Sequence, residues 1–384
     1  FQLCQLIEKD ELVCFAARDP LRPAAPSPKL NIPYRAVKRI PENALRLTRS
    51  VVGEPASYLF EELKNWHIKR RIISKAINFG QEERVDCVWA VMQGKTIIIS
   101  ALAVASALNV PLITQIWDEP SWILTDTNLD RWSKRKVLKK FDDAISRSAI
   151  CAAASWQMAK EYREKYKIKT VVFVGSLDEK MAVKPAGRLH NNAKLKIGFA
   201  GQLYAKEEWQ ALLLALDSVK WRIGGRDVAI SLIGRFDKLK LPTSKVERLG
   251  YHTLKETIEL LSQMDINYCP YWFDKKHEEI ARTSFPSKLT SYLAAGRPML
   301  FHGPRYASPA RFLRENEAGV CCYSLQKKEI INCLSDLVLN EKKYSLLSHH
   351  GHRAFKKFLT FASQKREMQK FLNTVRPLIK GGPE

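Results

Sequence analysis

The sequence predicts an α/β protein built from two doubly wound, Rossmann-like domains that face a cleft. Three observations support this prediction. Short apolar runs alternate with helical periods, as in the repeated strand–helix–strand units of a parallel sheet. A polar stretch over 175–194 interrupts the alternation, which then restarts. The 384 residues also exceed what one hydrophobic core ordinarily holds.

The first series occupies the N-terminal half, where we expect a domain over 1–180. Its expected elements alternate between buried strands and helices with an apolar stripe. They are strands at Leu12–Ala17, Val85–Val91, Pro111–Trp117, Ala149–Ala154 and Thr170–Val174, and helices at Ala56–Asn78, Thr96–Leu108, Arg131–Arg147 and Trp156–Tyr166. The chain starts at Phe1 rather than Met, and its first residues resemble the end of a helix. We therefore expect the native N-terminus, and with it a first strand–helix unit, to be missing.

The second series follows a linker that we place at 181–194, and it forms an expected domain over 195–360. The expected strands are Leu195–Ala200, Val228–Ile233, Val246–Gly250, Asp265–Pro270, Pro298–His302 and Val320–Tyr323. The expected helices are Glu207–Val219, Leu254–Met264, Ser287–Ala295, Pro309–Asn316 and Gln326–Leu339, with a helical end over Glu341–Val375. Ligands of such sheets bind beyond the carboxyl ends of the strands.

Composition narrows the function classes. The formal charge of +23 attracts polyanions such as nucleic acid, anionic lipid or phosphorylated substrates, without choosing among them. The eight cysteines form no CxxC pair, so we expect reduced core thiols rather than disulfides or zinc. No signal peptide is visible, and polar residues interrupt the longest apolar stretch, Ile97–Ile113, which predicts a buried helix and strand rather than a membrane span. Neither GxGxxG nor GxxxxGK[ST] occurs.

Two segments carry the strongest chemical signal. In Ile197-Gly-Phe-Ala-Gly-Gln-Leu-Tyr-Ala-Lys206 a strand ends in glycine, and a lysine opens the next helix. Gly201 permits close backbone approach to a ligand, and Lys206 with the helix N-terminus would attract phosphate. The alternative is an ordinary strand–helix turn with a solvated lysine.

The second segment is Arg282-Thr-Ser-Phe-Pro-Ser-Lys-Leu-Thr-Ser-Tyr-Leu-Ala-Ala-Gly-Arg-Pro298. Ser284 or Ser287 can cap a helix that Gly296 ends. Ser287, Lys288 and free backbone N–H groups would suit a diphosphate. The alternative is a capped structural helix.

Together these two segments resemble the donor-site segments of GT-B glycosyltransferases, in particular the large retaining family four with its bacterial capsule and lipopolysaccharide enzymes. Pro111-Leu-Ile-Thr-Gln-Ile-Trp-Asp118 resembles the family's strand that ends in an acid near the acceptor, and Ala152-Ala-Ala-Ser-Trp-Gln-Met-Ala159 resembles its strand-to-helix turn before the linker. The resemblance implies that the last helix, over 361–384, returns to the N-terminal domain. It assigns the donor site to Gly201, Gln202, Lys206, Arg282, Ser287, Lys288 and Ser291.

The sequence departs from the family pattern at several positions. Gln202 stands where the family usually has arginine, and Thr283 and Ser291 stand where it has two glutamates. Glu278 and Glu279 lie just upstream of the first of these positions. The family's catalytic histidine would follow Val91, where the chain reads Met-Gln-Gly. We therefore take Asp118 as the candidate general base or acceptor-orienting acid, with a turn or cap residue as the alternative.

The resemblance implies a glycosyltransferase that moves a sugar from a nucleotide-diphosphate sugar to a glycan or lipid-linked acceptor, with retention, in surface polysaccharide biosynthesis. No metal or other cofactor is expected, and we interpret His349, His350 and His352 as a solvated cluster rather than a ligand set. A catalytically inactive GT-B-like binding or partner protein remains the alternative. No recognisable nucleic-acid module occurs, so nucleic acid is not an expected partner.

We expect a cytoplasmic protein that is peripheral on the inner face of the cell membrane. Two basic, aromatic-bearing helices would meet an anionic membrane surface. One holds Lys64, Trp66, His67, Lys69, Arg70, Arg71 and Lys75 with Leu63, Ile68, Ile72, Ile73 and Ile77; the other holds Arg131, Trp132, Lys134, Arg135, Lys136, Lys139 and Lys140. The alternative is that each helix packs its apolar stripe on the sheet and solvates its charges.

Overall fold

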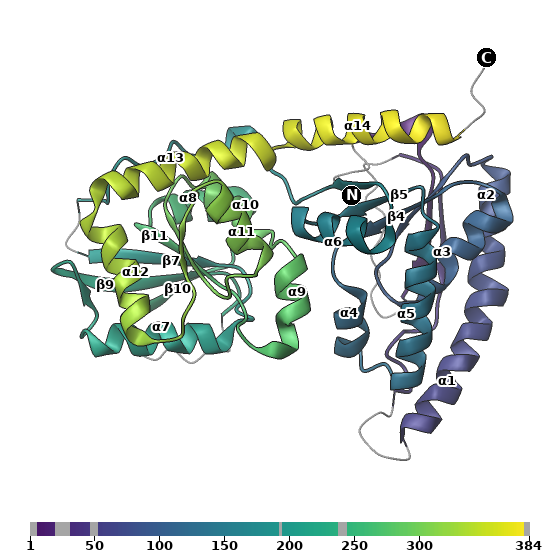
Figure 1. Ribbon diagram of the computed structural model, residues 1–384, viewed down its shortest axis with the longest axis horizontal. Helices are drawn as coiled ribbons and strands as arrows, with labels where there is room; N and C mark the ends of the chain where they lie inside the picture. The colour runs from purple at the N-terminus through teal and green to yellow at the C-terminus, as the bar shows by residue number, and fades with distance from the viewer. Residues whose placement is uncertain (1–5, 20–30, 47–52, 192–193, 237–243, 380–384) are drawn as a thin grey trace. The chain divides into compact units, whose positions relative to one another are not determined.

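The computed structural model describes residues 6–19, 31–46, 53–191, 194–236 and 244–379. Its contacts divide the chain into two compact units (Figure 1). Unit 1 comprises Phe1–Phe173 and Lys365–Glu384, and unit 2 comprises Val174–Gln364. Three features named above lie partly outside the described residues: Cys4, residues 192–193 of the expected linker and residues 380–384 of the last helix.

Unit 1 contains a parallel four-stranded sheet and a separate parallel pair. The sheet has the order β3-β4-β5-β6, and the pair joins β1 to β2. The strands are β1 (Cys14–Arg18), β2 (Tyr34–Lys38), β3 (Val88–Val91), β4 (Leu112–Ile116), β5 (Ile150–Ala153) and β6 (Thr170–Val172). Strands β4 and β5 are buried along their whole length, as expected for a sheet covered on both faces.

Helices cover both faces of the unit 1 sheet. They are α1 (Gly53–His67), a π-helical segment η3 (Ile68–Ile73), α2 (Ser74–Glu82), α3 (Lys95–Leu108), α4 (Pro120–Asp126), α5 (Arg131–Ser146) and α6 (Trp156–Tyr166), with a short 3-10 turn at Lys9–Glu11. One core cluster joins the sheet to α3, α4, α5 and α6. The other cluster joins it to Met368, Phe371 and Val375 of α14 (Phe361–Ile379), which Figure 1 shows lying over β4 and β5.

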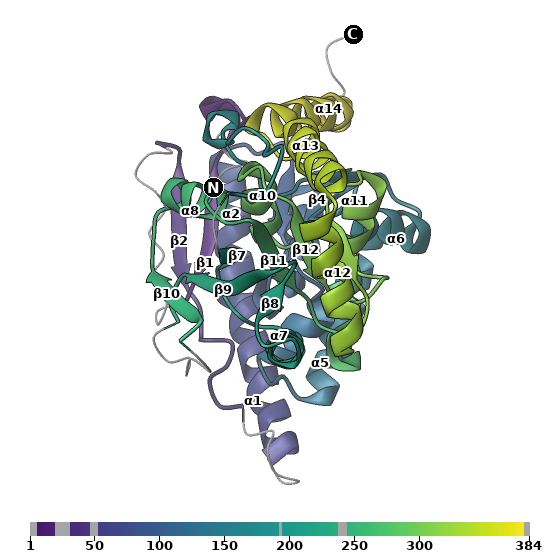
Figure 2. The same cartoon turned by 90° about the vertical axis from the view of Figure 1, so that its left-hand side faces the viewer.

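Unit 2 is built on a seven-stranded sheet. Its six parallel strands have the order β10-β9-β7-β11-β12-β13, and β8 pairs antiparallel with β9. Figure 2 shows β10, β9, β7, β11 and β12 side by side. The strands are β7 (Lys194–Ala200), β8 (Arg222–Ile223), β9 (Arg226–Ile233), β10 (Val246–Gly250), β11 (Ile266–Pro270), β12 (Met299–His302) and β13 (Val320–Cys322). The strand order reverses between β7 and β11, which makes their carboxyl ends the expected ligand crevice of such a sheet.

The helices of unit 2 are mostly those that the apolar periods predict. They are α7 (Lys206–Ser218), α8 (Leu254–Ser262), α9 (Glu278–Thr283), α10 (Lys288–Ala294), α11 (Ser308–Glu315), α12 (Lys327–Leu339) and α13 (Glu341–Phe358), with 3-10 turns at Glu179–Met181 and Lys275–His277. The buried core cluster runs from β7 and β9 through α7 to α12. A Thr253–Glu256 capping box starts α8, with the reciprocal bonds that this sequence pattern predicts.

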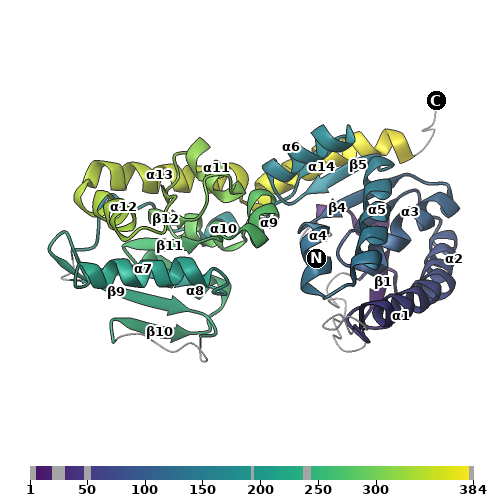
Figure 3. The same ribbon diagram turned by 60° about the horizontal axis from the view of Figure 1, so that its bottom comes forward.

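Several elements differ from the sequence-based expectation. The single helix expected over Ala56–Asn78 is divided by the π-helical turns of η3, and α1, η3 and α2 follow one another along one edge of unit 1 (Figure 3). Strand β2 and helices α4 and α9 were not expected. The expected linker is packed against unit 2: Val183 N–H donates to the Ala294 carbonyl at 2.8 Å, and Ala186 N–H donates to Gly296 at 2.9 Å. The division between the units falls at Phe173 and Val174, before that segment.

Candidate functional site

Three neighbouring strands of unit 2 end in, or are followed at once by, a glycine in the left-handed region of backbone space. Gly201 follows β7 with φ +90°, Gly234 follows β9 with φ +139°, and Gly250 ends β10 with φ +81°. Gly201 N–H donates to the Ile233 carbonyl at 2.9 Å, and Gly234 N–H donates to Gly250 at 2.7 Å. A Cβ on Gly234 would lie 3.3 Å from the Gly201 oxygen. The carboxyl edge of the sheet therefore offers a floor of side-chain-free backbone that a ligand can approach closely.

Lys288 joins this floor to helix α10. Its ammonium donates to the Gln202 carbonyl at 3.0 Å and lies 4.1 Å from the ring centre of Tyr204 and 4.8 Å from that of Phe199. Burial against these rings lowers the pKa of Lys288 to about 8. In the described part of the chain no carboxylate forms an ion pair with Lys288, so the site presents a cation to an anion that approaches the Gly201 turn.

The other lysine of the predicted pair, Lys206, is exposed and is the first residue of α7, directly after the Gly201–Ala205 turn. Lys206 thus follows the C-terminal end of the turn after β7, and Lys288 of α10 contacts the start of the same turn at the Gln202 carbonyl, although 82 positions separate the two lysines (288 − 206). Two acidic residues follow Lys206 in the first turn of α7, Glu207 and Glu208. The Glu208 carboxylate accepts the Phe273 N–H at 2.7 Å, and burial raises its pKa. It fixes the loop after β11 rather than occupying the turn.

Aromatic rings line the β11 side of the same turn. The Tyr204 ring centre lies 4.4 Å from Trp272 and 6.0 Å from Tyr271. Trp272 stacks on His277 with centres 4.8 Å apart and planes 13° apart, and Asp274 holds the His277 ring at 2.7 Å. These contacts give the expected crevice between β7 and β11 a rigid aromatic wall, which suits the apolar face of a sugar or a base.

A second aromatic group stands at the far end of the glycine floor. Tyr251 follows β10 and is 72% exposed, and the Arg235 guanidinium lies 5.0 Å above its ring. Each of these residues comes directly after one of the floor glycines, Gly234 or Gly250. An exposed ring with a cation on one face provides a stacking platform whose remaining face is open to a planar group.

The remaining donor candidates are less accessible. Arg282 is half-buried near the end of α9, and Ser287 is exposed just before α10 but caps no backbone N–H with its side chain. Helix α10 has only seven residues, so its dipole adds little and Lys288 is the main charge there. Ser291 lies in the middle of α10 and is 9% exposed, while Thr283 donates back to Glu279 of its own helix. The roles assigned to Arg282, Ser287 and Ser291 stay predictions.

In unit 1 the carboxyl edge of the sheet is organised differently. Asp118 follows β4, is half-buried and precedes α4; it also has interactions of its own. The neighbouring Glu119 is buried and accepts the Tyr162 hydroxyl at 3.1 Å. Asp118 is thus the more accessible of the two acids, and its catalytic assignment stays a prediction.

A carboxylate of the chain itself occupies the helix N-terminus beyond β3. Glu42 accepts Lys95 N–H at 3.1 Å and Thr96 N–H at 2.9 Å. Gly94, with φ +89°, permits this approach, because a Cβ there would lie 2.9 Å from the Glu42 oxygen. Buried Met92 and exposed Gln93 stand where the resembled family has its histidine.

Beneath this cap, one buried carboxylate holds three cations. Glu61 is fully buried and contacts Arg46 at 3.0 Å, Lys64 at 2.7 Å and the ammonium of Lys95. Burial alone would raise the Glu61 pKa, but the nearby Lys95, Lys64 and Arg46 lower it overall. Desolvation lowers the pKa of both lysines. The cluster ties α1 to α3 and to the loop after β2.

The sequence itself has no match among known families. No protein-family model and no curated protein matches it. Solved structures do match. Anabaena HepE, solved with UDP and glucose, aligns with TM-score 0.59 at 13% identity over 90% of this chain and 87% of that chain. Sucrose-phosphate synthase from Thermosynechococcus elongatus aligns at 0.61 and 11% over 94% and 88%. A glycosyltransferase from Rickettsia africae aligns at 0.57 and 12% over 91% and 86%.

This chain has the GT-B fold. The fold was predicted from the two series of alternating elements and the motifs around Lys206 and Lys288. Within this GT-B protein, Tyr204, Trp272, Arg235 and Tyr251 were not predicted from the sequence. A signal for the last two was present, because each follows a glycine at the end of a predicted strand.

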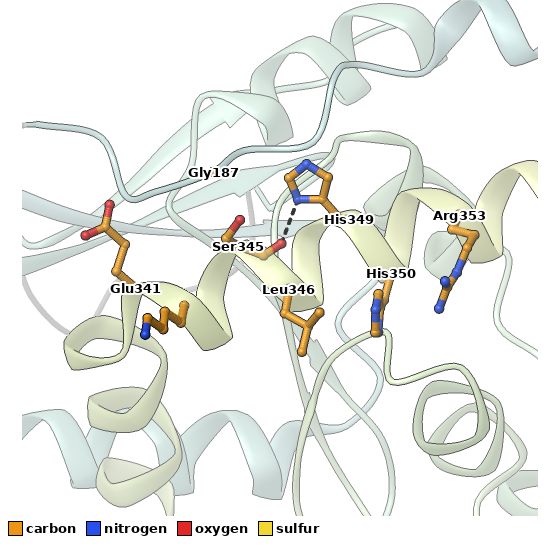
Figure 4. Close-up of a pocket in the computed structure, with 8 residues that line it drawn as sticks. Gly187, Glu341, Ser345, Leu346, His349, His350 and Arg353 are labelled. Carbon is orange, nitrogen blue, oxygen red and sulfur yellow. Dashed lines mark hydrogen bonds between the residues drawn. The ribbon is translucent and has the colours of Figure 1, made fainter.

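The histidine run of the GT-B chain lies on α13, away from the strand ends. Figure 4 shows the cavity of about 670 Å³ beside it, with His349 bonded to its own helix at the Ser345 carbonyl, 2.8 Å away. His350 lies 3.1 Å from Glu317. Among the described residues, no group of three or more potential metal ligands gathers anywhere. None of the donor candidates lines this cavity.

Proposed function

We propose that this protein is a glycosyltransferase that uses a nucleotide-diphosphate sugar, with the diphosphate at the Gly201 turn beside Lys288. One observation carries the proposal: an ammonium with no carboxylate partner in the described chain faces a glycine floor at the carboxyl edge of a Rossmann-like sheet. The three glycines of the floor leave room for phosphate oxygens, and Lys288 and Lys206 supply positive charge. The complex of HepE with UDP-glucose is consistent with this class of co-substrate.

The glycine floor also indicates how the nucleotide would lie. With the diphosphate at Lys288, the base would stack on Tyr251 beneath Arg235, at the other end of the row of three strands. During transfer, the bond from the anomeric carbon to the diphosphate oxygen breaks, and negative charge grows on the leaving group. Lys288 and Lys206 would stabilise that charge, which lowers the barrier. No metal is needed in this proposal, and Asp118 would orient or deprotonate the acceptor hydroxyl.

The acceptor and the stereochemistry are part of the same proposal. We propose a glycan or lipid-linked acceptor in surface polysaccharide biosynthesis, on the inner face of the cell membrane. Retention of configuration is proposed by analogy with one matching structure, a trehalose-6-phosphate synthase whose glycosyl transfer proceeds with retention. Analysis of the product anomer by NMR would decide this point.

In the part of the chain that the structure describes, no helix combines the length and apolar character needed to cross a bilayer.

The decisive experiment measures nucleoside-diphosphate binding by calorimetry. We expect Lys288→Ala and Lys206→Ala each to weaken binding by roughly 1.5–3 kcal/mol, because each removes a charge-assisted hydrogen bond. Lys342→Ala, which removes an exposed lysine from α13, serves as the matched control and should leave affinity unchanged. Unchanged affinity in both site variants would refute the phosphate assignment.

A second candidate function is a catalytically inactive GT-B-like binding protein. It is favoured by the region after β3, where Met92 and Gln93 replace the expected histidine and Glu42 fills the helix N-terminus. The two candidates differ in turnover. Donor binding that depends on Lys288, without hydrolysis or transfer of a labelled sugar to any of a panel of acceptors, would support the binding protein. Transfer that is lost in Asp118→Asn, with donor affinity kept, would support the enzyme.

A further inference from the structure

Helix α1 is inverted relative to an ordinary surface helix. Its buried residues are polar or small: Gly53, Ser57, Glu61 and Lys64. Three of its large apolar side chains are exposed instead: Leu59 by 66%, Leu63 by 64% and Trp66 by 58%. The spacing of these three, i, i+4 and i+7, places them on one face. A globular protein gains nothing from such an arrangement unless another apolar phase covers the exposed face.

The inversion is built into the fold and does not result from weak packing. The inward face of α1 is held by the Glu61 carboxylate, which pairs with Arg46 of the loop after β2 and with Lys95 of α3. Lys64, on α1 itself, pairs with the same carboxylate and donates to the Glu42 carbonyl of that loop at 3.3 Å. Lys95 also donates to the Glu61 carbonyl at 3.2 Å. Because the buried charges are paired and hydrogen-bonded, α1 cannot rotate to bury its apolar face without breaking them.

The exposed face of α1 continues into a groove shared with α5, which contacts α1 in unit 1 (Figure 1). The groove encloses about 580 Å³ and has a largely apolar lining. Its lining residues are Pro55, Tyr58, Leu59, Trp132, Arg135, Lys136 and Lys139. Tyr58 and Trp132 meet edge to face at 6.0 Å, so the two helices form an aromatic wall that remains accessible.

Basic side chains surround this apolar surface. Six of the first ten residues of α5 are basic, and Lys69, Arg70 and Arg71 lie exposed in η3, the segment after α1. Two guanidinium groups lie over the exposed indoles: Arg70 at 5.1 Å from Trp66 and Arg131 at 4.5 Å from Trp132. An indole with a cation over it, beside aliphatic side chains, suits the boundary between lipid headgroups and acyl chains. The ring and the aliphatic side chains can insert among the acyl chains, while the cation contacts headgroup phosphate.

We propose that the α1–α5 face, defined as Tyr58, Leu59, Leu63, Trp66 and Trp132 with the surrounding basic residues, docks on an anionic lipid bilayer. The proposal rests on unit 1 alone and does not depend on sugar transfer. A second copy of the chain fits the face poorly, since two such basic surfaces would repel each other. Single-stranded nucleic acid would stack on the indoles but leave the aliphatic side chains of Leu59 and Leu63 in water.

This surface differs from the one that the sequence predicts. Lys64 is 5% exposed and pairs with Glu61, so it cannot reach a headgroup. Ile68 and Ile72 are buried against β1, β2 and α3 and form part of the unit 1 core. The membrane-facing apolar residues are therefore Leu59, Leu63 and Trp66 on α1, which are exposed, whereas the two isoleucines face the core.

The test is sedimentation of the full chain with vesicles. We expect binding to phosphatidylcholine vesicles that contain phosphatidylglycerol, loss of binding as salt rises, and no binding to phosphatidylcholine alone. The variant L59Q/L63Q/W66Q should lower the partition coefficient by about tenfold or more, because it removes the apolar face. The separate charge variant R135E/K139E should also weaken binding to anionic vesicles at low salt, because it replaces two basic side chains with acidic ones. Both should keep the wild-type melting temperature and nucleoside-diphosphate affinity, which separates this proposal from the proposed function.

A matched control removes exposed apolar side chains elsewhere. L339Q/L346Q changes two leucines of unit 2 that are 71% and 51% exposed, and it should bind vesicles like the wild type. Equal binding to neutral and anionic vesicles, or no binding to anionic vesicles at low salt, would overturn the proposal. Two further results would overturn it. One is self-association of the lipid-free chain that L59Q/L63Q/W66Q abolishes, because a second copy would then be the occupant of the face. The other is a higher affinity of the face for single-stranded RNA than for anionic vesicles.

Discussion

Two strand-to-helix turns of this chain each contain a glycine in the left-handed region and differ in what fills them. The turn after β3 in unit 1 has Gly94 at φ +89°, and the turn after β7 in unit 2 has Gly201 at φ +90°. Each leads to a helix whose first residue is lysine, Lys95 or Lys206. In unit 1 the lysine is 1% exposed and the helix N-terminus holds Glu42; in unit 2 the lysine is exposed.

This difference separates a turn that stabilises the fold from one that can receive a ligand. A helix N-terminus and a nearby ammonium attract an anion in either case. Unit 1 supplies its own anions, Glu42 for the backbone and Glu61 for the lysine. Unit 2 leaves the Gly201 turn facing Lys288, whose contacts among the described residues are one carbonyl and two rings. A glycine–lysine turn in the sequence therefore predicts an anion site without telling whether the protein fills it.

The largest expected effect tests whether the unit 1 turn is structural. Glu61→Gln leaves three buried cations without their carboxylate and should lower the free energy of unfolding of unit 1 by about 3–5 kcal/mol, measured by urea denaturation. Glu62→Gln on the same helix removes an exposed pair with Lys136 and should have little effect. Because the Glu61 pKa is lowered in the folded state, its contribution should be present above the ordinary carboxyl pKa and disappear as pH falls through the folded value. Equal stability of the two variants would contradict the comparison.

A smaller effect is expected when each of the two glycines, Gly94 and Gly201, is replaced by alanine. Alanine at either position must adopt a left-handed backbone, which costs roughly 1–2 kcal/mol. At Gly94 the new Cβ would also lie 2.9 Å from Glu42, whereas at Gly201 the nearest atom is Lys288 Cε at 3.9 Å. We expect Gly94→Ala to destabilise the protein by about 1–3 kcal/mol more than Gly201→Ala in the same denaturation assay. Gly201→Ala should instead act on nucleoside-diphosphate affinity, and the opposite ranking would mean that the two turns have been assigned the wrong way round.

The smallest effect concerns pH and sharpens the assignment of Lys288. Its pKa of about 8 in the free protein should rise when a diphosphate binds, because the anion stabilises the ammonium. Affinity should thus be highest below pH 8 and fall by up to about tenfold per pH unit above it. The ligand's own phosphate ionisation, at about 6, lies outside this range. Lys288→Arg should abolish the dependence, since arginine stays charged; a persisting pH dependence in that variant would exclude Lys288 as its source.

The sequence predicts the GT-B fold well because buried parallel strands and amphipathic helices have strong local periods. Strands β3 and β5 are continuous apolar runs, and β7 and β9 end in buried apolar residues. The inversion of α1 could not be predicted this way. Leu59, Leu63 and Trp66 have the spacing of a core stripe, and the tertiary pairing of Glu61 with Arg46 and Lys95, which come from other segments of the chain, holds them outward.

The candidate site was predictable in part, for a related reason. Both lysines have local signals in the sequence: Gly201 precedes Lys206 in the same turn, and Ser287 stands directly before Lys288. The rings that crowd Lys288 come from β7 and the turn that follows it, far away in sequence, so neither its lowered pKa nor the aromatic wall could be inferred. Glu42 belongs to a loop with no motif, which explains why the closure of the unit 1 turn was also missed.

The path of α14 has a consequence for how the protein is made. Residues from Lys365 onward belong to unit 1, where Met368, Phe371 and Val375 pack against Ile113, Ile150 and Phe173. One face of that core therefore lacks its cover while the ribosome completes all of unit 2. Unit 2, by contrast, is contiguous and can fold as it emerges. Nascent unit 1 must wait with apolar strands exposed, which makes it the part of the chain that most needs a chaperone during synthesis.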